Sequence, residues 1–284
     1  MVMNKVFWLK ISAFLFLFLA VAYSPAQVVD DYLGDEADLY AQTKQVNQFF
    51  RRFNGEEDQK GERYYARDRE YRSKKLRKKY LEILFDNENP FITEDLKNDF
   101  TDHVLDNRDP VFLNFHGGHW FAEVTTKFDY RGIERYLTLF LELEEDTVGS
   151  KWVITNVYFE PFSKAFMDQD SLRVKGQKFL HPLSHELDFM NLVRAFKDQN
   201  SIEHYLAWKY EPDYLTLFIY EVKQGNLVFK TISDVKFHFF QVDGWYFELS
   251  EFNRKGYNKG WLISTLMKIT DKDKDVLMKF IYHE

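Results

Sequence analysis

The chain of 284 residues contains no cysteine. This absence excludes disulfides, thiol nucleophiles and thiolate metal sites, together with the cysteine that a bacterial lipoprotein carries directly after its signal. Glycine and proline are scarce, at 12 and 6 residues, and the composition is neither low-complexity nor disordered. Basic residues are not in excess, because the formal net charge is −7; this balance argues against nucleic-acid binding.

Long hydrophobic runs are also missing. The apolar run over residues 11–23 covers about 13 residues, which is too short to cross a bilayer comfortably. Lys5 and Lys10 precede this run, and the small residues Ser24 and Ala26 follow it. We therefore expect residues 1–26 to be a signal peptide, so that the mature chain is soluble and either periplasmic or secreted. An uncleaved amphipathic anchor is the alternative.

Familiar catalytic motifs are absent as well. The sequence contains no G-x-S-x-G, H-E-x-x-H, P-loop or dinucleotide-binding pattern. We expect no cofactor and no metal, and the sequence does not establish an enzymatic activity.

Aromatic residues are abundant, at 29 Phe, 17 Tyr and 6 Trp. After a polar lead-in over 27–44, helical spacing over 45–58 places Val46, Phe49, Phe50 and Phe53 on one face. A charged helix is predicted over 62–85, supported by opposite charges four residues apart. Another is predicted over 92–107, with Thr93 as its N-cap.

Strand patterns follow Pro110 and then return after a second helical stretch. The first set covers 111–116, 119–129, 133–145 and 150–160, with short turns typical of an antiparallel meander. Helical patterns over 184–198 and 201–210 precede a second set of strands over 214–223, 227–241, 245–252 and 260–270. This order predicts an α+β fold with a first domain over 45–161, a linker over 162–184 and a shorter second domain over 185–284.

The two halves are similar in sequence. The segment "FFRRFNGEE" from Phe49 is similar to "LVRAFKDQN" from Leu192, and Tyr136 and Trp152 have counterparts in Tyr246 and Trp261. With helices in front of a long meander, each half resembles the NTF2-like (cystatin-like) superfamily. The whole chain resembles two such units in tandem, as in small exported proteins of Bacteroidota. The resemblance implies curved antiparallel sheets wrapped around helices and an apolar pocket, but no single reaction.

The segment "FLNFHGGHWF" places two histidines around a Gly-Gly pair. If Gly117 and Gly118 form a two-residue hairpin turn, His116 and His119 are directly opposed across two strands. The alternation then sends Phe115 and Trp120 into the core and leaves the opposite face to a candidate ligand-binding group. This group consists of Asn114, His116, His119 and Phe121. Further metal ligands are not indicated, and Glu123 is too far along the strand.

Two charged segments allow alternative interpretations. The basic run "RSKKLRKK" either forms a solvated helix face or contacts an anionic surface through Arg72, Lys74, Lys75, Arg77, Lys78 and Lys79. The run "DKDKD" from Asp271 lacks the Gly and Glu of a calcium loop and predicts a polar turn. The segment 276–284 after it fits a strand and a helix equally.

From these patterns we expect a non-enzymatic exported module that binds a ligand or a protein partner, including a second copy of itself. The alternative is a small-molecule carrier or enzyme with a pocket near His116 and His119, suited to an apolar or glycan ligand.

Overall fold

The computed structural model describes residues 46–58, 60–146, 149–166, 196–197, 199–207, 210–255 and 258–283. The chain divides into two compact units, Met1–Gln48 and Phe49–Glu284. Everything below concerns the second unit. None of the helices in the described ranges combines the length and the apolar character that crossing a bilayer requires.

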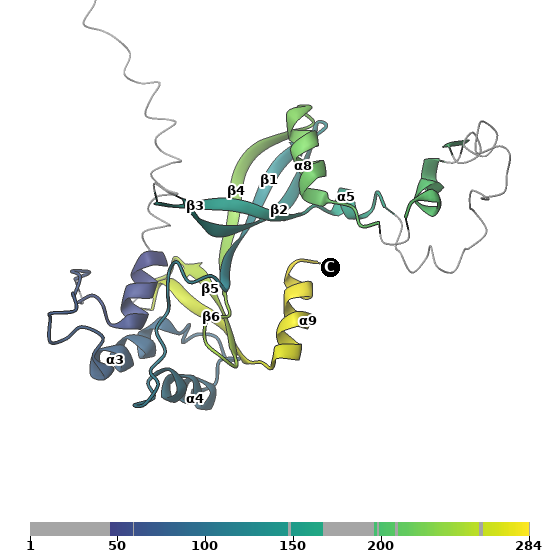
Figure 1. Ribbon diagram of the computed structural model, residues 1–284. Coiled ribbons are helices and arrows are strands. Elements are labelled where there is room, and N and C mark those ends of the chain that lie inside the picture. The colour runs from purple at the N-terminus through teal and green to yellow at the C-terminus, as the bar shows by residue number, and fades with distance from the viewer. Residues whose placement is uncertain are drawn as a thin grey trace, which may run out of the picture. The chain divides into compact units, whose positions relative to one another are not determined.

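The second unit is an α+β fold built on one antiparallel sheet of six strands (Figure 1). The strand order is β3-β2-β1-β4-β5-β6, so the pairing of β1 with β4 joins two consecutive meanders. The strands are β1 (Trp120–Tyr130), β2 (Ile133–Asp146), β3 (Gly149–Tyr158), β4 (Leu227–Phe239), β5 (Trp245–Phe252) and β6 (Gly260–Lys268). The order is symmetrical about the β1–β4 pair: β1, β2 and β3 follow one another outward on one side, and β4, β5 and β6 do so on the other.

Helices cover one face of the sheet at both ends. At one end, helical residues 49–54 and α4 (Glu94–Val104) pack aromatic rings against the sheet. Phe50 contacts Trp120, and Phe100 contacts Phe247. The helix α3 (Lys74–Leu84) lies at the same end, where the bridge between Phe85 and Ile263 reaches β6 (Figure 1).

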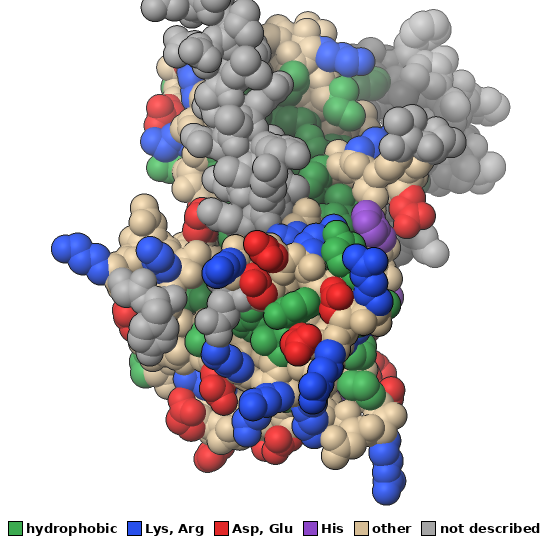
Figure 2. All heavy atoms as spheres, turned by 90° about the vertical axis from the view of Figure 1, so that its left-hand side faces the viewer, with side chains coloured by type: hydrophobic (Ala, Val, Ile, Leu, Met, Phe, Trp, Pro, Cys, Tyr) green, Lys and Arg blue, Asp and Glu red, His purple; other side chains and the backbone are tan. Residues whose placement is uncertain are grey.

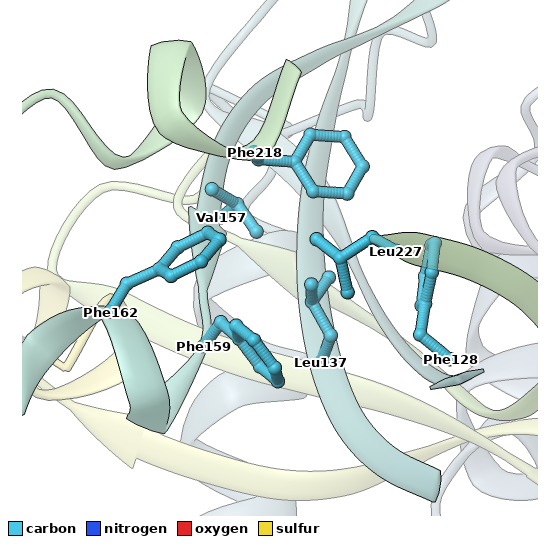
Figure 3. Packing of buried hydrophobic residues seen from close by; sticks show 7 residues of the cluster. All are labelled: Phe128, Leu137, Val157, Phe159, Phe162, Phe218 and Leu227. Carbon is cyan, nitrogen blue, oxygen red and sulfur yellow. The ribbon is translucent and has the colours of Figure 1, made fainter. Parts of the chain in front are cut away.

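At the other end of the same face, α5 (Glu160–Ser163) and α8 (Tyr214–Lys223) enclose a second cluster. Figure 3 shows its buried side chains converging from the strands and these two helices. They are Phe128, Leu137, Val157, Phe159, Phe162, Phe218 and Leu227. Since Trp120 and Phe128 are an even number of residues apart on β1, both clusters lie on one face, which we call the helix-covered face.

The opposite face is covered by the terminal helix α9 (Asp271–Ile281), and we call it the α9 face. Phe121 of β1, Phe140 of β2 and Tyr246 of β5 form a cluster there with Ile281. Leu277, Met278 and Tyr282 pack against its edge. The C-terminal segment, which the sequence left open between strand and helix, is therefore a helix.

The prediction of a polar turn at "DKDKD" is wrong, because these residues form the first turn of α9. Thr270 is the N-cap, and a reciprocal capping box joins its side chain to Asp273. A capping box satisfies two backbone N–H groups that the first turn leaves without a partner. The acidic residues also lie at the positive end of the helix.

Most predicted strands agree with the structure to within about three residues, a typical error for element boundaries. The predicted strand 111–116 is wrong. Its backbone is held by groups from helices instead of by a strand: Asn54 exchanges two hydrogen bonds with Leu113, and Val104 O accepts from Val111 N. No neighbouring strand in the described part of the chain pairs with it.

Three further predicted elements need correction. Residues 214–223 were predicted as a strand but form α8, because Asp213 caps the first turn by accepting from Thr216 N. The charged helix begins only at Lys74, since Asp58 and Asp68 bind nearby backbone N–H groups and hold 58–68 in turns. Residues 199–205 form a 3₁₀ helix, η1 (Gln199–Tyr205).

The Thr93 cap and the buried Phe49, Phe50 and Phe53 are confirmed. Of the predicted helix over 184–198, only residues 196–197 are described, and these are helical; the rest of it and most of the linker lie outside the described residues.

Candidate functional site

The part of β4 that extends beyond β5 carries exposed apolar side chains. β4 pairs with β1 along its whole length but with β5 only over Lys236–Phe239. Residues 227–235, which we call the β4 arm, therefore have one edge without a paired strand in the described part of the chain. Unpaired strand edges are ready templates for contacts with other chains.

Two irregularities in the β4 arm bring apolar side chains onto one face. In the pairing of β4 with β1, Ser233 and Lys230 have no partner residue on β1. As a result, Ile232 lies opposite Thr126, and Phe229 lies opposite Phe128. Both residues consequently lie on the helix-covered face, although they are three positions apart. Phe229 is 52% exposed and Ile232 is 38% exposed. Figure 2 shows hydrophobic side chains at the surface in the upper half of the view.

Charges of both signs flank these apolar residues. Lys230 precedes Ile232 by two positions and Asp234 follows it by two, and both are exposed. No ion pair within the described ranges involves either side chain. The β4 arm therefore combines an apolar centre with one positive and one negative end.

A buried polar relay lies on the α9 face. His238 of β4 is 1% exposed and joins two neighbouring strands. Its Nε2 lies 2.9 Å from Glu123 Oε2 on β1, and its Nδ1 lies 2.8 Å from the Tyr246 hydroxyl on β5. An ionised carboxylate only accepts hydrogen bonds, so Nε2–H donates to Glu123 and Nδ1 accepts from Tyr246 in the neutral imidazole.

The surroundings of the relay determine the acidity of its end groups. Burial alone would raise the pKa of Glu123, but the hydrogen bond from His238 and the nearby positive charge of Lys236 outweigh it and hold this pKa below its usual value. Burial and the nearby carboxylates of Glu248 and Glu123 raise the pKa of Tyr246 well above its usual value. The relay thus has an ionised, partly exposed end at Glu123 and a neutral buried end at Tyr246.

Aromatic rings and α9 close over the relay. Phe121 stacks on His238 with ring centroids 4.9 Å apart, and it also stacks on Tyr282. His283 stacks on Tyr158 at 3.8 Å, which fixes the end of α9 above β3. Groups of this kind can pass a proton along hydrogen bonds. Here, however, the side chains of the relay bond to one another. The bonds therefore hold β1, β4 and β5 in register beneath α9.

The structure does not bring the four predicted ligand-binding residues together as expected. His116 and His119 are exposed in an irregular turn, and no hairpin opposes them. His116 Nδ1 lies 2.8 Å from Ser150 Oγ, and Asn114 accepts from His116 N in a local turn. Phe121, which was expected beside the histidines, is 3% exposed and belongs to the apolar cluster of the α9 face.

The loop is held by Gln241, whose amide donates to the carbonyls of Asn114 and Gly118. Both backbone groups of Asn114, which the hairpin would have paired with Phe121, are bound to the Gln241 side chain instead. The predicted face-to-face histidine pair is therefore wrong.

The basic run is only partly exposed. Lys74, Lys75, Lys78 and Lys79 lie on the surface of α3. Arg77 was expected among them, but it is 2% exposed and donates to the carbonyls of Phe53 and Val111, so its assignment to an anionic contact is wrong. Burial and the charge of Arg72 lower the pKa of Arg77 to about 10. Arg72 is paired with Glu56.

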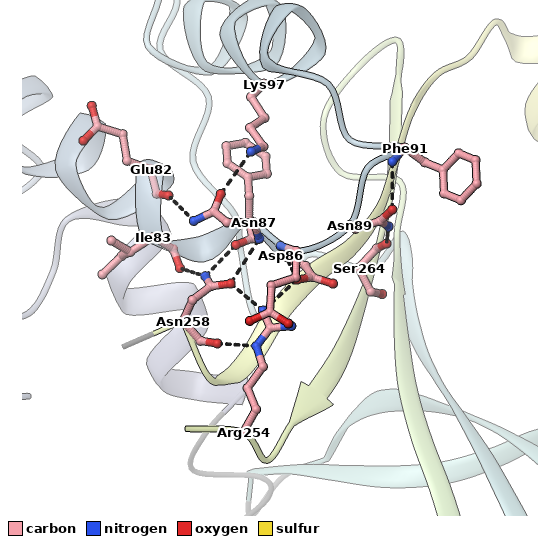
Figure 4. A network of polar contacts seen from close by, with 12 residues as sticks. Glu82, Ile83, Asp86, Asn87, Asn89, Phe91, Lys97, Arg254, Asn258 and Ser264 are labelled. Atoms are coloured by element: carbon pink, nitrogen blue, oxygen red, sulfur yellow. Dashed lines mark hydrogen bonds and ion pairs between the residues drawn. The ribbon is translucent and has the colours of Figure 1, made fainter. Parts of the chain in front are cut away.

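A second polar network joins the segment after α3 to the β5–β6 loop (Figure 4). Arg254 pairs with Asp86 at 2.6 Å, and Asn258 accepts from Asn87 N while donating to Phe85 O. These contacts tie residues more than 160 positions apart, and every group faces another protein group. We interpret the network as structural.

A small recess lies at the start of α9, between Phe240, Trp245 and Lys274, with a volume of about 50 Å³. That is room for a few water molecules and far below the roughly 300–1,000 Å³ of typical ligand pockets. Within the described ranges, no group of three or more His, Asp or Glu side chains comes together as a metal site would require.

Sequence reasoning missed the relay because its partners are far apart in the chain. Glu123 and His238 are separated by 115 positions. The one available signal was His238 itself, a histidine inside the aromatic stretch "VKFHFF". Comparison with known families, with characterised proteins and with solved structures finds no match to this chain.

Proposed function

We propose that this chain is an exported, non-enzymatic interaction module that self-associates through the β4 arm. The observation that carries the proposal is the pair of exposed apolar residues, Phe229 and Ile232, on a strand segment whose outer edge has no paired strand among the described residues. Exposed apolar residues at a strand edge are typical of a surface that another chain covers.

The charges of the arm favour a second copy as the partner. In a two-fold arrangement centred on Ile232, the two arms run antiparallel, and each residue before the centre meets one after it. Lys230 of one copy then faces Asp234 of the other, twice per dimer. The arm also contains Val228, Phe229, Thr231 and Ile232, residue types that favour strands.

Other features support the remaining parts of the proposal. The acid–base groups of the relay are engaged with one another beneath α9, which favours a scaffold over a catalyst. The symmetrical strand order supports a tandem arrangement of two NTF2-like units. The short apolar run at residues 11–23 supports export by a signal peptide.

Sedimentation velocity of the full chain over a range of concentrations tests the proposal. We expect a monomer–dimer equilibrium that Ile232→Asp shifts to monomer, because it places two carboxylates at the centre of the contact. Lys230→Asp and Asp234→Lys should each weaken the dimer roughly tenfold through like charges, and the double charge exchange should restore it.

Ile133→Asp is the matched control, because Ile133 is 56% exposed on β2 outside the arm. A wild-type chain that stays monomeric at all concentrations would falsify self-association. A dimer that Ile232→Asp leaves intact would place the contact elsewhere on the molecule.

A further inference from the structure

The surface formed by α3 and the loop before it has a charge opposite to that of the chain. Residues 60–79 contain ten basic and three acidic residues, whereas the whole chain has a formal charge of −7. Figure 2 shows Lys and Arg side chains spread among Asp and Glu in the lower half of the view. Such a local excess of one sign creates a positive surface potential that attracts anionic partners.

On α3, three lysines form one stripe. Lys75, Lys78 and Lys79 follow the i, i+3, i+4 spacing that places side chains on one helix face. The opposite face of α3 is buried and contributes Arg77, Tyr80, Leu81 and Leu84 to the interior. The packing of α3 therefore holds the lysine stripe outward.

The cations of this surface are available for a partner. Lys75, Lys78 and Lys79 are exposed, and within the described residues none of them has an ion pair. The same holds for Arg63, Arg67 and Arg69 in the preceding loop. Tyr65, in that loop, is 56% exposed. Tyrosine is enriched at the boundary between lipid headgroups and water.

We propose that the lysine stripe of α3, with the arginines of the preceding loop, docks this protein on an anionic phospholipid surface. Lysines near such a surface gain attraction from many headgroups at once, and an exposed tyrosine adds contact at the headgroup level. Arg77 is not part of the contact, because its guanidinium is used inside the protein. The proposal does not depend on self-association, which involves a different surface.

Co-sedimentation of the full chain with vesicles tests the proposal. The vesicles contain equal parts of phosphatidylglycerol and phosphatidylcholine, and pure phosphatidylcholine vesicles serve as the uncharged comparison. An apolar run such as residues 11–23 can bind lipid by itself, so the readout is the difference between variants that all retain it.

The triple variant Lys75→Glu, Lys78→Glu, Lys79→Glu should lower binding to the anionic vesicles roughly tenfold or more. The matched control is Lys255→Glu, Lys272→Glu, Lys279→Glu, which makes the same charge change at exposed lysines elsewhere. It should retain most of the binding. In about 1 M salt, where the Debye length falls to about 3 Å, wild type and stripe variant should become equal.

Circular dichroism of both variants confirms that they are folded before they are compared. Equal losses in the two triple variants would show a general charge effect and overturn the proposal. The same conclusion follows if the stripe variant binds as well as wild type, or if soluble polyphosphate binds the stripe while the vesicles do not.

Discussion

His238 shows how a single polar residue can organise a sheet. It lies in β4 with 1% exposure, where an unpaired imidazole would be costly, and each ring nitrogen meets a partner from a different neighbouring strand. Because Glu123 and Tyr246 come from β1 and β5, the relay specifies the register of three strands at once. A hydrocarbon side chain at this position would pack but would not specify register.

The ionised end of the relay should make stability depend on pH. The folded pKa of Glu123 lies below its unfolded value, so the carboxylate contributes stability above the unfolded pKa and loses it as pH falls through the folded pKa. Glu123→Gln keeps an acceptor but removes the charge. We expect about 1 kcal/mol of destabilisation at neutral pH and a vanishing difference below the folded pKa.

Chemical denaturation at several pH values measures this effect. Glu251→Gln, an exposed substitution on β5, is the control and should change stability little at any pH. If the Glu123→Gln variant is as stable as wild type at neutral pH, the charge of Glu123 does not strengthen its hydrogen bond with His238.

At the scale of elements, α9 depends on its N-terminal cap. Thr270 accepts from Asp273 N, and Asp273 in turn accepts from Thr270 N. Much of the other contact between α9 and the sheet is apolar, so the cap sets where the helix begins and which residues face the sheet. In that register, Leu277, Met278 and Ile281 pack in the apolar cluster of the α9 face.

Thr270→Ala should therefore destabilise the protein by about 1 kcal/mol, the usual loss on removing a helix cap. Hydrogen exchange should localise the faster opening to the backbone amides of α9. Thr270→Ser, which keeps the hydroxyl, should retain most of the protection. Equal exchange in the alanine and serine variants would mean that the hydroxyl is not the stabilising group.

At the scale of the whole molecule, the pairing of β1 with β4 unites the halves of the chain. Trp120 of β1 stacks on Phe239 of β4 at 5.3 Å, and Phe239 stacks on Phe247 of β5 at 4.7 Å. Phe239 is fully buried between the helices and the sheet. Rings from β1, β4 and β5 therefore pack together at this junction.

Phe239→Ala should destabilise the fold by about 3–5 kcal/mol through the cavity that it leaves. Because the ring contacts both meanders, we expect β2 and β5 to lose hydrogen-exchange protection together. A variant in which β5 and β6 open while β1–β3 stay protected would show instead that the halves are independent folding units.

The sequence by itself determined what depends on neighbours along the chain. The spacing of Phe49, Phe50 and Phe53 specified a buried helix face, and Thr93 specified the start of α4. The period-two patterns located the strands to within a few residues. These features follow from local geometry, which repeats every few positions and can be read without knowing what lies opposite.

Only the tertiary structure decided what depends on partners far away. Asn54 draws Leu113 out of the sheet, Arg77 turns inward to two carbonyls, and His238 finds Glu123 across 115 positions. The skipped residues Lys230 and Ser233 turn Phe229 and Ile232 to one face, which strict alternation would not allow. Each outcome rests on which distant groups satisfy a buried donor, acceptor or strand edge, and such long-range pairing leaves no periodic trace in the sequence.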